Sequence, residues 1–121
     1  MITQILAPLL MMQAAPAETA PAQPAPQLNA QQRASLRCSA AFALVSYGQD
    51  QGNADALKWP TMQTRGREYF VRTSAQIMDE YELNRDQVGE LVAQEALSLI
   101  NKNELEAIMP ACLTMLETSG L

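Results

Sequence analysis

The chain has 121 residues, a net charge of −5, two cysteines and no histidine. Its length allows one domain, and an acidic chain without an aromatic-studded basic stretch is not expected to bind nucleic acid. The missing histidine removes Ser-His and Cys-His nucleophile pairs and every histidine zinc site, and two cysteines cannot form a four-thiolate site. We therefore expect no catalytic residue, no metal ligand and no cofactor in a protein that is not an enzyme.

The N-terminus is typical of a signal peptide. The apolar stretch Ile5–Met12 has the length of a signal core and is far shorter than the roughly 20 residues that a membrane-spanning helix needs. A small-residue cleavage pattern ends at Ala17, which predicts removal of residues 1–17 and a periplasmic or secreted protein without a membrane span. No lysine or arginine precedes this stretch and Pro8 interrupts it, so the alternative is an apolar arm on a cytoplasmic protein.

Residues 18–28 are rich in Ala, Pro and Gln and show no apolar periodicity. The closely spaced prolines Pro21, Pro24 and Pro26 are incompatible with a helix and favour a semi-extended chain. We interpret this stretch as a disordered linker, and residues 29–121 as the helical domain.

The first helix of that domain is predicted to begin after Asn29 or Ser35, either of which suits a helix N-cap, and to end at Gly48. It is apolar around much of its girth and is therefore expected to be the central helix. Two apolar stripes account for this pattern, one of Leu36, Ala40, Ala43, Leu44 and Tyr47 and the other of Cys38, Phe42 and Val45.

A polar loop with a short helical turn at about 54–58 leads to a second helix, expected over about 61–81. Gly66 lies in its interior, where glycine costs about 1 kcal/mol relative to alanine. This glycine predicts a close approach to another helix.

The third helix is expected to be capped by Asn84 with Gln87 in the capping-box position, and the last segment by Asn103. Pro110 interrupts that last segment, which predicts two short helices of about 104–109 and 110–118 or one kinked helix. No segment alternates with the period of a strand. The fold class is therefore all-α, a small bundle of four to five helices.

Charge is distributed unevenly over the domain. Residues 30–75 carry six basic and three acidic side chains, a net charge of +3, whereas residues 76–121 carry two basic and nine acidic side chains, a net charge of −7. The two halves are expected to attract each other within the fold or between the subunits of a homo-oligomer.

The cysteines lie 74 residues apart, which excludes a redox C-x-x-C motif. In an oxidising compartment a pair of this kind in a small domain predicts a disulfide between Cys38 and Cys112. In the chain-entropy model such a bond stabilises the fold by about 4 kcal/mol. In the cytosol both thiols would instead be small buried apolar groups.

Several other residues are candidates for a functional surface. Arg65, Arg67 and Arg72 on the second helix form a candidate interaction surface for an anionic partner, and Met62 and Met78 are candidates for an adaptable client-binding groove. Ordinary solvation and core packing are the structural alternatives.

Glu95 falls within an apolar stripe of the third helix. Its position predicts a buried ion pair with Arg37, Arg65 or Arg72, the alternative being a general acid with a raised pKa.

These observations favour a small secreted or periplasmic binding or stress-related module, without enzymatic activity and stabilised by one disulfide. In plan, a small helical domain whose first and last helices are joined by a cysteine pair is similar to periplasmic acid-stress chaperones, which implies a protein partner. The alternatives are a carboxylate-based enzyme or enzyme accessory subunit, and a structural homo-oligomer.

Overall fold

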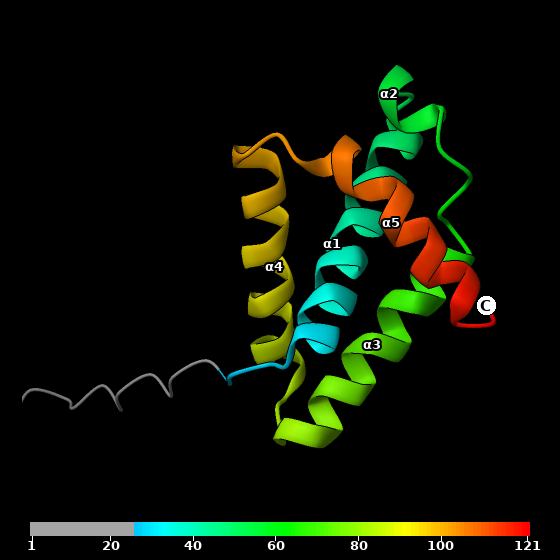
Figure 1. The fold of residues 1–121 in the computed structure, drawn as a ribbon. Coiled ribbons are helices and arrows are strands. Elements are labelled where there is room, and N and C mark those ends of the chain that lie inside the picture. The colour runs from blue at the N-terminus through cyan, green and yellow to red at the C-terminus, as the bar shows by residue number, and fades with distance from the viewer. Residues whose placement is uncertain (1–25) are drawn as a thin grey trace, which may run out of the picture.

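The computed structural model describes residues 26–121, and within that range the chain forms five helices and no strand (Figure 1). The predicted all-α bundle is confirmed. The predicted signal peptide and most of the predicted linker lie outside the described residues. In chain order the helices are α1 (Ala30–Asp50), α2 (Ala54–Leu57), α3 (Arg65–Tyr81), α4 (Arg85–Asn101) and α5 (Leu105–Thr118).

Helix α1 is the centre of the bundle, as its apolar girth predicts. It packs against each of the other four helices and lies between α4 on one side and α3 and α5 on the other (Figure 1). Leu36, Phe42 and Val45 are at most 2% exposed. Around them the rest of the chain contributes a buried set of Met62, from the connection before α3, and Tyr69, Ile77, Val88, Val92, Leu99, Met109, Cys112 and Leu116 from α3, α4 and α5.

Helix α1 begins as expected and ends later than expected. Asn29 accepts a hydrogen bond from the backbone N–H of Gln32, whose side chain accepts one from the Asn29 N–H, which completes a capping box. The predicted end at Gly48 is wrong, because the helix continues to Asp50 and the left-handed residue that follows it is Gly52, with φ 72°. Gly48 instead permits close packing, since a Cβ there would lie 2.8 Å from the Cβ of Ala56.

The side chain of Gln49 explains why α3 begins at Arg65 and not near residue 61. Its Nε2 donates to the carbonyl oxygens of Ala56, Trp59 and Pro60, and its Oε1 accepts from the N–H of Met62 at 3.0 Å. These bonds satisfy the backbone of a non-helical connection, which the apolar pattern alone could not distinguish from a first helical turn.

Gly66 is buried at the crossing of α3 with α1. A Cβ there would lie 3.2 Å from the Cβ of Phe42 and 3.0 Å from that of Met62. The close approach predicted from this glycine is therefore present.

Asn103 has a different role from the one predicted. With φ 52° it lies in the left-handed region, its N–H bonds to the Ile100 carbonyl, and the N–H of Glu104 bonds to the Leu99 carbonyl. This pattern closes the C-terminus of α4, and asparagine tolerates it better than most residues. The residue before α5 is Glu104, and α5 runs through Pro110 as a single helix. Of the two arrangements expected around Pro110, the division into two helices is therefore wrong and a single helix is observed.

Candidate functional site

Cys38 and Cys112 are brought together from the middle of α1 and the middle of α5. Their Cα atoms are 5.2 Å apart and their sulfur atoms lie at bonding distance, which is the geometry of a disulfide. Both residues are at most 2% exposed, and the Met115 sulfur lies 3.6 Å from that of Cys38. The pair is thus a buried link between the two helices, and neither sulfur is presented as a surface nucleophile.

The oppositely charged halves meet within the molecule. Each ion pair between described residues joins a basic side chain of the N-terminal half to an acid in α5 or directly before it: Arg37–Glu104, Lys58–Glu106 and Arg65–Glu117. The Glu106 carboxylate raises the pKa of Lys58 above its ordinary value by accepting a hydrogen bond from it. Three positive charges of the N-terminal half are thus paired within the molecule, a number equal to the net charge of +3 of residues 30–75.

The predicted arginine surface is therefore reduced. Arg65 binds Glu117 and also donates from Nε to the Leu121 carbonyl at 2.8 Å. Arg72 donates to the Ser119 carbonyl at 3.1 Å. Arg67 and Arg72 are exposed, and the side chain of Arg67 makes no hydrogen bond or ion pair with described residues. Since the other two arginines are engaged near the end of α5, the three do not form a common basic site for an anion.

The predicted methionine surface needs correction as well. Met62 is 2% exposed because it fills the space beside Gly66, so it belongs to the core. Met78 is half-buried against the same core at the other end of α3. The two methionines do not share a surface.

Glu95 is half-buried on α4, and none of the ion pairs among residues 26–121 includes it. Its three expected partners are engaged elsewhere, Arg37 with Glu104 and the other two arginines near the end of α5. The predicted buried ion pair is therefore not formed. The position of Glu95 in the helical repeat correctly predicts that it lies near the core. It does not predict which side chains lie beside it.

A hollow between α1 and α3, which we call the aromatic groove, was not anticipated from the sequence. Its volume is about 550 Å³, its floor contains Phe42 and Gly66, and Phe70 lines it. Tyr47 and Val71 also line it and are 67% and 58% exposed. Tyr47 was expected on a core stripe, but near the end of α1 it extends past the packed region. Arg67 and Asp50 place one charge of each sign on the lining.

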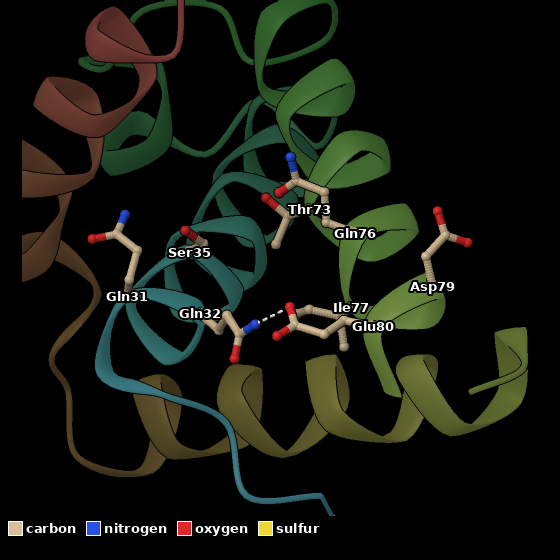
Figure 2. A pocket seen from close by; sticks show the side chains of 8 residues that line it. All are labelled: Gln31, Gln32, Ser35, Thr73, Gln76, Ile77, Asp79 and Glu80. Carbon is tan, nitrogen blue, oxygen red and sulfur yellow. Dashed lines mark hydrogen bonds between the residues drawn. The ribbon is translucent and has the colours of Figure 1, made fainter. Parts of the chain in front are cut away.

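A second hollow, which we call the polar groove, lies along the other half of α1 and α3. It consists of two adjoining spaces that share Gln31, Ser35, Thr73 and Gln76. Figure 2 shows one of these spaces, with Gln32 of α1 donating a hydrogen bond to Glu80 of α3 across it. Its lining is mostly amide and hydroxyl side chains, and it has no residue in common with the aromatic groove.

Residues 26–121 contain no cluster of three or more side chains suited to holding a metal ion. Within the same range, no helix combines the length and the apolar character needed to cross a membrane. No family model matches the chain, and comparison with curated proteins and with solved structures gives no significant match.

Proposed function

We propose that this protein is a non-enzymatic binding module of the periplasm or the extracellular space that holds apolar segments of a partner protein in the aromatic groove. The observation that carries the proposal is the exposure of two large apolar side chains, Tyr47 at 67% and Val71 at 58%, beside one groove. Exposed apolar surface next to a hollow of this kind is typical of a protein-binding site.

The shape and chemistry of the groove support an unfolded or extended partner segment. The aromatic side chains Phe70 and Tyr47 provide contact area for apolar side chains of varied shape. The groove is open and its charges are balanced, so recognition would depend on apolar burial and less on a particular charge pattern. This is the property required of a stress-related module that binds many partners.

The cysteine pair supports the proposed compartment. A buried disulfide between the first and last helices persists in the periplasm or outside the cell and is rare in the cytosol. Intact mass measurement on protein purified from its native host tests this part of the proposal. We expect loss of residues 1–17 and a mass two hydrogens below that of the reduced chain, whereas a full-length reduced species would refute it.

The two alternative functions have less support. Glu95, the candidate general acid, lines neither groove. A homo-oligomer held by opposite charges has less support, because Arg37, Lys58 and Arg65 of the basic half are already paired within the molecule.

Binding of a reduced, alkylated and therefore permanently unfolded protein tests the proposed function. We expect Val71→Ser and Tyr47→Ser to weaken this binding by about tenfold each, because each removes apolar area worth about 1.4 kcal/mol. Leu57→Ser is the matched control, since Leu57 is also 58% exposed and lines neither groove. Equal losses in all three variants, or no binding by the wild-type protein, would contradict the proposal.

A further inference from the structure

The aromatic groove continues along α3 into a second, smaller hollow. This hollow has a volume of about 390 Å³ and shares two lining residues with the groove, Arg67 and the exposed Val71. The rest of its lining is Glu68, Arg72 and Leu121, of which Leu121 is half-buried against the core. The two hollows therefore form one surface, and Arg67 lies at their junction.

The charge at this junction is positive and available to a partner. The side chain of Arg67 is exposed and forms no hydrogen bond or ion pair with residues 26–121. With Arg72 and Glu68 it gives the smaller hollow two positive charges and one negative charge, a net charge of +1. Arg72 uses one of its donors for the Ser119 carbonyl. An acidic side chain of a bound segment would therefore be stabilised beside Arg67.

The negative charge of the aromatic groove lies further along α1. Gly66, the residue before Arg67, meets α1 at Phe42, where a Cβ on the glycine would lie 3.2 Å from the Phe42 Cβ. Asp50 lies eight residues beyond Phe42, a rise of about 12 Å, and it is exposed and outside the ion pairs of the described range. An extended chain covers about 3.3–3.6 Å per residue, so three or four residues span the distance between the two charges.

From these positions we infer that the aromatic groove prefers apolar segments that carry an acidic side chain and, three or four residues away, a basic one. The acid would lie at Arg67 and the base at Asp50. The inference rests on the proposed function, because burial of apolar side chains against Tyr47 and Phe70 supplies most of the affinity. Exposed ion pairs add little each, so the two charges orient a bound segment and discriminate between apolar segments by modest factors.

Titration of the isotope-labelled protein with three peptides, followed by NMR, tests the inference. All are acetylated and amidated: Asp-Leu-Val-Leu-Lys, its neutral analogue Asn-Leu-Val-Leu-Gln, and Leu-Asp-Lys-Val-Leu, which has the first composition with adjacent charges. We expect saturable shifts of the Tyr47, Arg67 and Val71 resonances, with the first peptide binding about tenfold more tightly than the neutral one and about threefold more tightly than the third.

Equal affinity for the three peptides would overturn the inference and leave the proposed function intact. Absence of binding by all three would overturn it as well, and the assay with unfolded protein then shows whether the proposed function fails with it. Shifts of the same resonances on concentrating the protein alone would overturn it in favour of a second copy of the chain as the occupant.

Exchange of single charges on both partners sharpens this test. In the wild-type protein, replacing the Asp of the first peptide by Asn should weaken binding about threefold, and in Arg67→Gln the same replacement should have no effect. Arg67→Glu should reverse the preference, so that a peptide with Lys in place of this Asp binds more tightly than the original. Arg33→Gln is the matched control, because Arg33 is an exposed arginine of α1 that lines neither hollow, and it should keep the wild-type preference. A preference for Asp that persists in Arg67→Gln, or that Arg33→Gln loses equally, would refute the assignment.

Discussion

Helices α4 and α5 both belong to the acidic half of the chain, yet they are attached to the bundle in different ways. Helix α5 is linked to α1 through Cys38 and Cys112, and its charged side chains and those beside it form three ion pairs with the N-terminal half. Near its C-terminal end the carbonyls of Ser119 and Leu121 accept hydrogen bonds from arginines of α3.

Helix α4 has no comparable attachments among the described residues. Its side-chain hydrogen bonds there are those of its own cap, between Asn84 and Gln87. It is held by the burial of Val88, Val92 and Leu99 against α1, while Leu97 and Ile100 on its outer face are more than half exposed.

This difference has a consequence for local stability. An element held by apolar contacts alone opens with a lower free energy than one held by a covalent link and polar contacts as well. We therefore expect the amide protons of α4 to exchange with solvent faster than those of α5.

The largest expected effect comes from removing the covalent link. The double variant Cys38→Ser/Cys112→Ser should lose about 4 kcal/mol of unfolding free energy, because a closed loop of more than 70 residues no longer restricts the unfolded chain. Denaturant unfolding of the oxidised wild type and the variant measures the loss, and hydrogen exchange should show α5 becoming as labile as α4. Identical unfolding midpoints would mean that the link does not stabilise the fold.

Leu99→Ala tests the other helix. Leu99 is fully buried, so its truncation should cost about 3 kcal/mol and accelerate exchange mainly in α4. Leu97→Ala, two residues earlier and 57% exposed, is the control and should change little. Equal acceleration in α4 and α5 would show that the two helices open as one unit.

The difference between the helices was only partly predictable from the sequence. The pairing of the cysteines and the attraction between the halves follow from residue types and their distribution, which are properties of the chain. The particular ion-pair partners do not follow from the sequence. Residues 76–121 contain nine acids, and only the folded chain places Glu104, Glu106 and Glu117, and not the other six, beside basic side chains. Glu95 is an example: the sequence predicts which face of the helix it lies on, but not which side chains from other helices lie beside it.

The helix ends show the same limit on a smaller scale. Asn84 and Gln87 act locally, and their capping box was readable from spacing alone. Asn103 is suited to both an N-cap and a left-handed C-terminal position, and only the direction of the chain after α4 decides between them. The role of Gln49 is not predictable from the sequence, because its four hydrogen bonds reach residues up to 13 positions away.

A smaller effect is expected from the arginine contacts at the end of α5. Arg65→Gln should lower the unfolding free energy by about 1 kcal/mol, because the partly exposed ion pair with Glu117 and the bond to the Leu121 carbonyl are both weakened. Arg67→Gln removes an exposed arginine two residues further on that has no partner in the described range, and it should be neutral. The difference in unfolding free energy between the two variants should shrink as the salt concentration rises. If it does not, the effect of Arg65 is not electrostatic.

The smallest expected effect is a pH dependence at the other end of α5. Because Glu106 raises the pKa of Lys58 above its ordinary value of 10.5, this pair stabilises the fold at pH values below 10.5, and its contribution is lost as the pH rises through the higher folded-state pKa. The difference in unfolding free energy between wild type and Lys58→Gln should therefore shrink between pH 9 and pH 12. Lys102→Gln, at the end of α4, removes an exposed lysine with no ion pair in residues 26–121 and should give a difference that does not change with pH. A pH-dependent difference of the same size for Lys102 would mean that general charge repulsion, and not the contact with α5, is the cause.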